Sequence, residues 1–168
     1  GEESGMHGPE NADYEWIIDP LDGTTNFVRG IAQFAVSIAC RYQGQLEHAV
    51  VSDPVKREEF CASRGQGATL NGKKIRVSSA RSLTGSLLVT GIPFSKETVQ
   101  HIDAYHALSK AMLQYDTAGI RRPGAASLDL AYLAAGRYDG FWEMNLRPWD
   151  IAAGVLLIRE AGGRVSDL

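Results

Sequence analysis

Two aspartates three positions apart, Asp19 and Asp22, are the side chains of this sequence that most clearly suggest chemistry. They lie in residues 16–27, WIIDPLDGTTNF, where an apolar run is followed at once by turn residues. Two carboxylates held this close repel each other unless a cation lies between them. The Gly-Thr-Thr that comes next presents backbone N–H groups of the kind that bind phosphate. The segment therefore predicts metal-assisted phosphate chemistry.

The elements around this segment decide how the two carboxylates are placed. We expect residues 16–18 to form a short buried strand that carries Asp19 at its C-terminal end. Pro20 should end that strand, because it has no N–H to give to a sheet. A simpler interpretation stays open here, since Asp-Pro and Asp-Gly are ordinary turn dipeptides. Asp22 would then only cap a helix that begins near Thr24.

Three further segments contain candidate site residues, each with a simpler alternative. Glu2 is the first of two adjacent glutamates, and such pairs are usually solvated surface. Asp150 precedes an expected apolar helix at 151–161, where it can serve as a helix cap. Residues 121–127, RRPGAAS, enter another expected helix. The arginines can be plain surface, whereas the small residues after them allow a ligand close to the backbone.

The pattern along the chain predicts a run of strands followed by alternating strands and helices. A polar loop is expected at 4–15. Strands are expected at 34–42, 46–52, 58–63 and 74–78, and their short turns imply an antiparallel meander. Further strands are expected at 86–91, 140–144 and 164–167, with helices at 96–115, 125–135 and 151–161. This order predicts an α/β layered sandwich, with an antiparallel sheet followed by a mixed sheet with flanking helices.

Composition and charge narrow the class of protein. The net charge of −3 and the pI of about 5.8 argue against direct nucleic-acid binding. No apolar run reaches the length of a membrane span, and no signal peptide is visible. Cys40 and Cys61 are expected to be buried free thiols in a reducing cytoplasm. Both ends of the chain are expected to be cuts through a domain, so that N-terminal and C-terminal parts are lacking.

Taken together, these motifs resemble the inositol monophosphatase family of magnesium-dependent, lithium-sensitive phosphatases. The resemblance rests on EES at 2–4, WIIDPLDGTTNF at 16–27, RGQGATLNG at 64–72, PWDIAAG at 148–154 and EAGG at 160–163. Their order and long separations match the family over essentially the whole chain. The detail LRPWD looks closest to the bacterial extragenic-suppressor type of inositol monophosphatase. The resemblance implies the layered fold of sugar phosphatases.

The resemblance also implies a metal site with two or three Mg²⁺ ions. Glu2, Asp19 and the carbonyl of Leu21 match the ligands of a first ion. Asp19, Asp22 and Asp150 match the ligands of a second ion, so that Asp19 bridges the two. All of these ligands are oxygens, as a hard cation requires. The residues that match catalytic positions are Glu2, Asp19 and Thr24, and Thr24 helps to orient the attacking water.

The substrate would be bound by residues from both halves of the chain. Gly23 and Thr24 match the turn that contacts phosphate, next to Asp22 and Asp150. The positions that match contacts to a polyol are Gly124, Ala125, Ala126 and Glu143, and Arg121 is a further candidate. Residues 1–82 would carry the first metal and phosphate motif and 83–168 the second metal and polyol motif. The two segments are expected to form one catalytic unit.

The implied function is metal-dependent hydrolysis of a phosphate monoester, with myo-inositol 1-phosphate as the expected substrate. Related enzymes act instead on a nucleotide 3′-phosphate, fructose bisphosphate or histidinol phosphate, and these alternatives stay open. A second class of function is a binding module for the transcription machinery, because the bacterial relatives are associated with transcription and ribosomal RNA synthesis through a protein partner. The resemblance further implies a cytoplasmic homodimer with no membrane contact.

Overall fold

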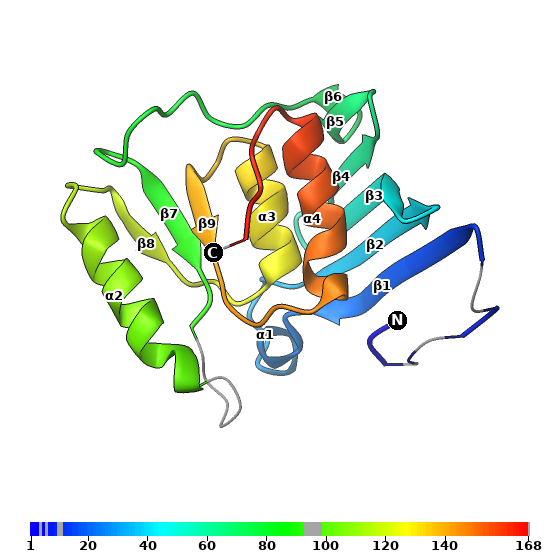
Figure 1. The fold of residues 1–168 in the computed structure, drawn as a ribbon, viewed down its shortest axis with the longest axis horizontal. Coiled ribbons are helices and arrows are strands. Elements are labelled where there is room, and N and C mark those ends of the chain that lie inside the picture. Colours follow the sequence, from blue (N-terminus) through cyan, green and yellow to red (C-terminus); the bar gives the residue numbers. More distant parts are fainter. Residues whose placement is uncertain (4, 6, 10–11, 93–98, 168) are drawn as a thin grey trace.

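The computed structural model describes residues 1–3, 5, 7–9, 12–92 and 99–167. Two sheets lie on either side of a pair of helices, α3 and α4, and helix α2 covers the outer face of the second sheet (Figure 1). The expected α/β layered sandwich is therefore confirmed. Segment 1–82 supplies the first sheet and segment 83–168 the second, while their joint action as one catalytic unit stays a prediction.

The first sheet contains six strands in sequence order, each antiparallel to its neighbours. Its strands are β1 Tyr14–Asp22, β2 Ala35–Tyr42, β3 Gln45–Asp53, β4 Glu58–Ser63, β5 Gly67–Leu70 and β6 Lys73–Lys74. Residues 14 and 15 thus belong to β1 and not to the loop expected at 4–15. That loop also includes residues 4, 6, 10 and 11, which lie outside the described residues. The expected antiparallel meander is confirmed.

Strand β1 differs from the short buried strand expected at 16–18. Ile17 is buried, but Trp16 is 60% exposed, so the apolar run is not wholly in the core. The expectation that Pro20 ends the strand was wrong, because β1 continues to Asp22 through a shift in register. Strand β1 is at the edge of the sheet, where a missing N–H leaves no partner strand unpaired.

The last hairpin of the first sheet forms at a turn that the sequence predicts. Asn71 and Gly72 have φ values of 47° and 76°, as a tight two-residue hairpin turn requires. The strand before this turn, β5, was not expected. The strand expected at 74–78 is reduced to the two residues of β6, because residues 75–78 form no strand.

The second sheet contains β7 Leu87–Thr90, β8 Gly119–Arg121 and β9 Gly140–Trp142 in the order β8-β7-β9. Its described strands are all parallel, so the expectation of a mixed sheet was wrong. The reason is that a helix separates each strand from the next, and such crossovers connect parallel strands. Strand β8 was not expected, and residues 164–167, expected as a strand, form none.

The helices follow the expected order with shifted ends. Short helix η1, Val99–His101, leads into α2, Ile102–Leu113, and part of the helix expected at 96–115 lies outside the described residues. Helix α3 is Ala126–Ala134 and α4 is Pro148–Glu160. Helix α4 begins three residues earlier than expected, because Pro148 is favourable in the first turn. The helix that the simpler interpretation places near Thr24 is present as α1, Thr24–Val28, but its N-cap residue is Gly23 and Asp22 does not cap it.

The main core lies between α3, α4 and the first sheet, around Val51, Phe60, Leu128 and Leu157. Gly154 of α4 lies directly against α3. A Cβ atom at this position would lie 2.5 Å from the Cβ of Leu130, so only glycine permits this close packing of the two helices.

Cys40 and Cys61 are both free, as expected. Cys40 is buried and Cys61 is only half-buried. In the described part of the chain, no helix combines the length and the apolar character needed to cross a membrane.

Candidate functional site

The irregularity in β1 brings Asp19 and Asp22 to the same face of the first sheet. Asp19 pairs with Ser37 of β2, and Asp22 pairs with Ala35, so three positions on β1 correspond to two on β2. Because Ser37 and Ala35 are two residues apart, they face the same side. The extra residue in β1 therefore turns both aspartates toward the helix layer. Asp19 is only 1% exposed, and its Oδ1 accepts the Leu21 N–H at 2.9 Å.

Asp22 connects the first sheet to the start of α3. Its Oδ2 accepts hydrogen bonds from the backbone N–H of Ser127 at 2.7 Å and from the Ser127 hydroxyl at 2.5 Å. The N-cap residue of α3, Ala125, has no side chain that could cap the helix. Asp22 therefore caps α3 from a distant part of the chain. A role of Asp22 as a helix cap is thus compatible with its predicted place in the site.

The turn that follows Asp22 packs against the segment that leads into α3. Gly23 has a φ of 85°, and a Cβ atom there would lie 2.8 Å from the carbonyl oxygen of Gln33 and 3.2 Å from the Cβ of Ala125. Asn26 donates from its side chain to the carbonyl oxygens of Pro123 at 2.9 Å and Gly124 at 3.3 Å. The predicted phosphate turn and the predicted polyol segment are thus in direct contact.

Thr24 and Leu21 are also in contact within this turn. The Thr24 hydroxyl donates to the Leu21 carbonyl oxygen at 2.9 Å. That carbonyl has a second lone pair, which remains compatible with the predicted role of Leu21 as a metal ligand.

Asp150 lies in the first turn of α4, where it is both a helix cap and a neighbour of Asp19. Its Oδ2 accepts the backbone N–H of Arg147 at 2.6 Å, which completes a capping box. The Ser37 hydroxyl donates to the carbonyl of Trp149 at 3.3 Å and joins the start of α4 to the first sheet. The start of α4 is therefore held beside the face of the sheet that carries Asp19.

Glu2 reaches the same place from the N-terminal segment. Its backbone N–H donates to the carbonyl of Ile18 at 3.1 Å, next to Asp19 in the chain. Loss of solvent and then the charge of Asp19 raise the pKa of Glu2 to about 7, although the residue as a whole is exposed. Glu2 therefore lies close enough to Asp19 for the two carboxyl groups to interact.

Burial and neighbouring charges raise the pKa values of the four acidic groups, although the hydrogen bond with Glu2 acts to lower that of Asp19. Burial, and then the charges of Asp19 and Asp150, raise the pKa of Asp22 to about 6 against the hydrogen bonds from Ser127. Burial raises the pKa of Asp19, and burial with the charge of Asp19 raises that of Asp150. Among the described residues, no lysine or arginine forms an ion pair with these three aspartates. The charge of Arg147 partly offsets that of Asp150, but the acidic groups predominate, so the cluster is rich in negative charge.

Glu143, just beyond β9, is the substrate residue predicted from the second half of the chain. It is half-buried and lies against Gly91, where any Cβ atom would overlap its carboxyl group. Burial, and then the charges of Asp22 and Asp150, raise the pKa of Glu143 to about 7. Glu143 therefore lies near the acidic cluster.

Of the two adjacent arginines, Arg122 interacts with Glu143 electrostatically. Arg121, the residue expected to reach the substrate, is exposed on β8, and its charge acts on Tyr138. The next residues of the predicted site, Ala125 and Ala126, are buried at the start of α3.

Two residues near the cluster were not predicted from the sequence. Ser127 holds Asp22 through two hydrogen bonds, as described above. Asp129, one turn into α3, is 1% exposed, and burial followed by the charges of Glu143 and Asp22 raises its pKa to about 8. The available signal was an acidic residue between Leu128 and Leu130 in a helix that is apolar on nearly every side.

The carboxylates do not yet surround a common point. In the part of the chain that the structure describes, no three acidic, histidine or cysteine side chains have the geometry to hold a metal ion as they stand. The donor set nevertheless fits a hard cation, because every candidate ligand is an oxygen and acidic groups predominate in the cluster.

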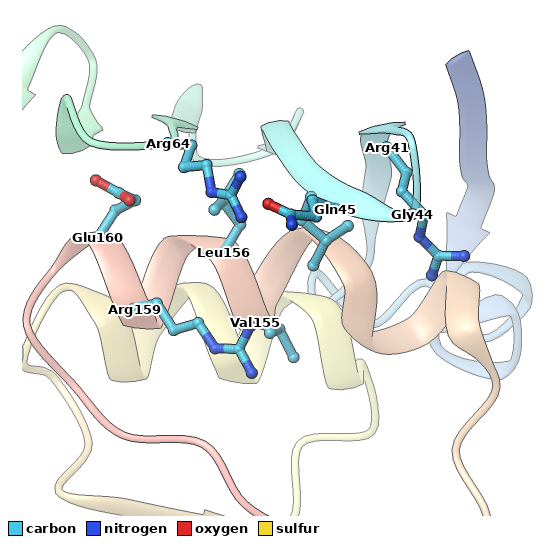
Figure 2. A pocket seen from close by; sticks show the side chains of 9 residues that line it. Arg41, Gly44, Gln45, Arg64, Val155, Leu156, Arg159 and Glu160 are labelled. Carbon is cyan, nitrogen blue, oxygen red and sulfur yellow. The ribbon is translucent and has the colours of Figure 1, made fainter. Parts of the chain in front are cut away.

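An open cavity among the described residues lies elsewhere. It is a groove of about 470 Å³ between the outer side of α4 and the strand ends of the first sheet, with Arg41, Arg64 and Arg159 around it (Figure 2). Arg41 pairs with Glu15 and Arg64 with Glu47, so these two charges are already balanced. We place the candidate site at the carboxylate cluster, because buried and mutually repelling acids indicate function more strongly than the volume of an open groove.

The chain is similar to known proteins over nearly its whole length. The family model described as "Inositol monophosphatase family" matches residues 1–168. The chain is 61% identical to the protein named Nus factor SuhB of Pseudomonas aeruginosa over 169 residues, which is 99% of this chain and 62% of that protein. It is 54% identical to Nus factor SuhB of Escherichia coli K12 over 166 residues, 99% of this chain and 61% of that protein.

Solved structures show the same fold. An inositol monophosphatase from Anabaena superposes with a TM-score of 0.89 at 43% identity, covering 97% of this chain and 64% of that one. The extragenic suppressor protein SuhB from Bartonella henselae superposes with a TM-score of 0.86 at 47% identity, covering 91% of this chain and 57% of that one. The present chain thus spans about three fifths of the length of these relatives. With a family model that matches its whole length, the chain belongs to the inositol monophosphatase family.

Proposed function

We propose that the protein of which this chain is part hydrolyses a phosphate monoester with the help of Mg²⁺, and that myo-inositol 1-phosphate is its substrate. The observation that carries this proposal is the group of four acidic residues, Glu2, Asp19, Asp22 and Asp150, which lie together without a balancing lysine or arginine ion pair among the described residues. A buried acidic cluster of this kind is unfavourable unless a cation binds it.

The proposed ligands follow from their positions. The charge of Asp19 acts on Glu2, on Asp22 and on Asp150, so Asp19 is the proposed ligand that would be shared by both ions. The Leu21 carbonyl would complete the first set. Bound Mg²⁺ would supply an activated water and positive charge for the phosphoryl and ester oxygens.

The remaining residues would bind and orient the phosphate. The φ of 85° at Gly23 turns the chain sharply before α1, and no side chain caps the N–H groups at the start of that helix. These N–H groups would donate to phosphate oxygens. Thr24, whose hydroxyl already has the Leu21 carbonyl as a partner, would orient the attacking water.

Glu143 would provide selectivity for a polyol. A half-buried carboxylate beside Asp22 can accept hydrogen bonds from ring hydroxyls, which a simple alkyl phosphate lacks. The backbone of Gly124 and Ala125, which touches the phosphate turn, would lie on the other side of the ring.

Phosphate release from the full-length protein tests the proposal. The substrates are myo-inositol 1-phosphate, a nucleotide 3′-phosphate, fructose bisphosphate and histidinol phosphate, each with Mg²⁺, with EDTA, and with Mg²⁺ plus Li⁺. We expect Mg²⁺-dependent release that is fastest on the inositol phosphate and is inhibited by Li⁺. Release that is unchanged by EDTA would reject the metal mechanism, and a faster reaction on another monoester would replace the substrate.

A role in transcription is a second candidate, because the relatives at 61% and 54% identity are named Nus factors. Such a role needs a protein partner in the transcription machinery and does not need turnover. A variant without metal-dependent activity, tested for transcription of ribosomal RNA genes in cells, separates the two functions. Normal transcription with the inactive variant would assign the transcription role to surfaces outside the carboxylate cluster.

A further inference from the structure

The short loop between α1 and β2 limits where the predicted phosphate turn can lie. The carbonyl oxygen of Gln33 lies against Gly23, where it leaves no room for a Cβ atom. The same oxygen accepts a hydrogen bond from the side chain of Asn26 at 2.8 Å. Gln33 thus touches both ends of the segment 23–26, and movement of Gln33 would move the turn with it.

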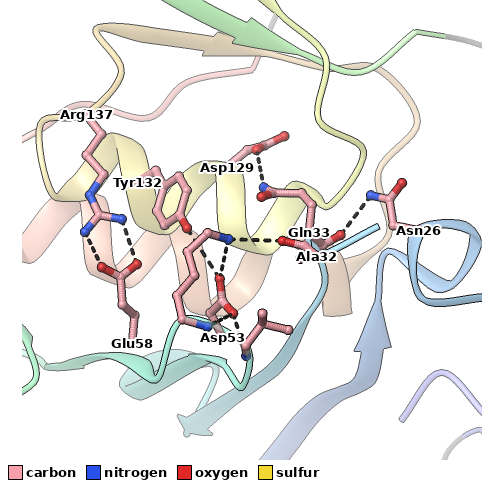
Figure 3. A network of polar contacts seen from close by, with 10 residues as sticks. Asn26, Ala32, Gln33, Asp53, Glu58, Asp129, Tyr132 and Arg137 are labelled. Atoms are coloured by element: carbon pink, nitrogen blue, oxygen red, sulfur yellow. Dashed lines mark hydrogen bonds and ion pairs between the residues drawn. The ribbon is translucent and has the colours of Figure 1, made fainter. Parts of the chain in front are cut away.

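A lysine from the turn that follows β3 holds this loop in place. Lys56, in the turn between β3 and β4, donates from Nζ to the carbonyl of Ala32 at 3.1 Å (Figure 3). Ala32 directly precedes Gln33 in the chain. The contact with Lys56 therefore fixes the backbone next to the Gln33 carbonyl, which lies against Gly23. The contact joins a side chain to a backbone oxygen 24 residues away.

The ammonium group of Lys56 is itself held by a buried acid. Its Nζ lies 2.8 Å from Oδ2 of Asp53, which is 1% exposed. Asp53 also accepts the backbone N–H groups of Val55 and Lys56 at 2.9 Å each and the hydroxyl of Tyr132 at 3.4 Å. The acid is therefore fixed by the turn and by α3, and it determines where the lysine points.

A second contact reaches the same loop from α3. The Gln33 side chain donates to Oδ1 of Asp129 through a long hydrogen bond of 3.5 Å. The loop is thus held at two adjacent residues, Ala32 by Lys56 and Gln33 by Asp129, while Asn26 connects it to the turn. Figure 3 shows these contacts as one chain along α3.

We infer that Lys56, fixed by Asp53, is a positioning residue for the phosphate turn, and that it acts through the loop of Ala32 and Gln33. The inference rests on the proposed function, because the turn must bind a phosphate for its position to matter for turnover. Lys56 would not touch the substrate. Its effect is to keep Gly23 and Thr24 where their N–H groups meet the phosphoryl oxygens.

The alternative is that Lys56 and Asp53 only stabilise the fold. The chain offers a matched control for this alternative in Arg137, which forms an ion pair with Glu58 in the same network. Its guanidinium packs on the Tyr132 ring at 4.5 Å, as the ammonium of Lys56 does at 5.7 Å. Among the described residues, the hydrogen bonds of Arg137 go to Glu58 and not to the loop, so it shares the structural role of Lys56 without the connection to the turn.

The experiment compares Lys56→Met with Arg137→Met in the full-length protein. Hydrogen exchange is measured for the amides of 23–28, together with kcat, KM and the unfolding temperature. For Lys56→Met we expect exchange in 23–28 to accelerate by about tenfold and kcat to fall by about tenfold or more, because small misplacement of a reacting group has a large kinetic effect. For Arg137→Met we expect the exchange rate in 23–28 and kcat to stay within twofold of the unaltered protein. This should hold even if Arg137→Met lowers the unfolding temperature as much as Lys56→Met does.

Each other outcome has a defined meaning. Exchange in 23–28 that is unchanged by Lys56→Met, or accelerated equally by both variants, would overturn the inference. If Lys56→Met does not fold, the double variant Asp53→Asn with Lys56→Met removes both charges of the pair. The same acceleration of exchange in 23–28 and the same fall in kcat are then expected of the double variant. If the unaltered protein releases no phosphate with Mg²⁺, the proposed function fails, and the exchange measurement alone still decides whether Lys56 positions the turn.

Discussion

The two sides of the α3–α4 layer are built differently. On the side of the first sheet, large buried residues such as Phe60 and Val51 fill the interface, and the buried acid Asp53 has a full set of donors. On the side of the second sheet, Leu88, Val89 and Trp142 are buried, but α2, on the outer face of that sheet, contains no buried residue. There, the indole N–H of Trp142 and the hydroxyl of Ser109 are enclosed without a hydrogen-bond partner among the described residues.

This difference matches a division of roles between the two sides. Most residues proposed for metal and phosphate, from Glu2 to Thr24, come from or next to the antiparallel sheet, which long ladders of hydrogen bonds make rigid. Asp150 is added from the start of α4, which Ser37 joins to the same sheet. Glu143, proposed for substrate selectivity, follows the smaller parallel sheet. A reaction that needs fixed charge positions is better served by the rigid side, whereas selectivity can change on the other without disturbing the chemistry.

The largest effect is expected from Asp22→Asn on the rigid side. The change keeps the shape of the side chain and an acceptor for Ser127. It removes one negative charge from the ligands of the proposed second metal ion. We expect kcat to fall by about a thousandfold, because metal stabilisation of the transition state is worth several kcal/mol. Unfolding by urea should change little, since the variant also relieves repulsion among the acids.

The matched control is Asp103→Asn, an exposed position in the first turn of α2. It removes the same charge far from the cluster and should leave turnover unchanged. Near-normal turnover of Asp22→Asn at saturating Mg²⁺ would remove Asp22 from the metal set.

Glu143→Ala on the second side should affect selectivity more than the reaction itself. We expect kcat/KM for myo-inositol 1-phosphate to fall about ten- to a hundredfold, because ring hydroxyls lose a hydrogen-bonding acceptor. Hydrolysis of a plain alkyl phosphate should change by less than about threefold, because that substrate has no ring hydroxyls to bond Glu143. An equal loss on both substrates would instead place Glu143 in support of the metals, and the division of roles would fail.

The shape of the phosphate turn can be tested with two glycines. Gly23→Ala and Gly30→Ala both place a side chain at positive φ, at 85° and 69°. That conformation alone costs about 1–2 kcal/mol in each variant. At Gly23 the new Cβ also meets the Gln33 carbonyl at 2.8 Å, whereas at Gly30 nothing lies within 4 Å.

We therefore expect urea unfolding to show Gly23→Ala less stable than Gly30→Ala by about 1 kcal/mol or more, since overpacking adds to the backbone cost. Turnover should fall only in Gly23→Ala. Equal stabilities would show that the loop of Gln33 yields easily, which would also weaken the positioning argument for Lys56.

The sequence predicts the part of the site that local motifs encode. A strand, an acidic turn and a glycine are contiguous in 16–27, so the placing of Asp19, Asp22 and Gly23 beside one another follows from that segment alone. The direction of the second sheet did not follow, because β8 is only three residues long and gives too weak a pattern to reveal the parallel crossovers.

Contacts between distant segments were not predictable either. Nothing in the sequence around Lys56 indicates that its side chain reaches Ala32, because that contact depends on how β2, β3 and β4 align. Asp129 illustrates the same limit, since a single aspartate in a helix is usually on the surface. Its burial follows from the two layers that enclose α3, and these are properties of the whole fold.

The smallest effect is expected at Glu58, whose ion pair with Arg137 lies at the end of the polar contacts along α3 that is far from Asn26 (Figure 3). The hydrogen bonds and charge of Arg137 lower the pKa of Glu58, with burial acting in the opposite direction. A lowered pKa means that the folded protein holds the proton less tightly than the unfolded chain. The ion pair therefore stabilises the fold above the pKa of the unfolded glutamate, and this contribution is lost as the pH falls through the folded pKa.

Glu58→Gln should thus cost about 1 kcal/mol or less at pH 7, because the partner guanidinium is partly exposed and screened. The difference from the unaltered protein should shrink as urea unfolding is repeated from pH 7 toward pH 3. Glu15→Gln, which breaks the more exposed pair with Arg41, is the control and should cost less still. A difference at Glu58 that stays constant down to pH 3 would mean that packing of the side chain, and not its charge, stabilises this end of the network.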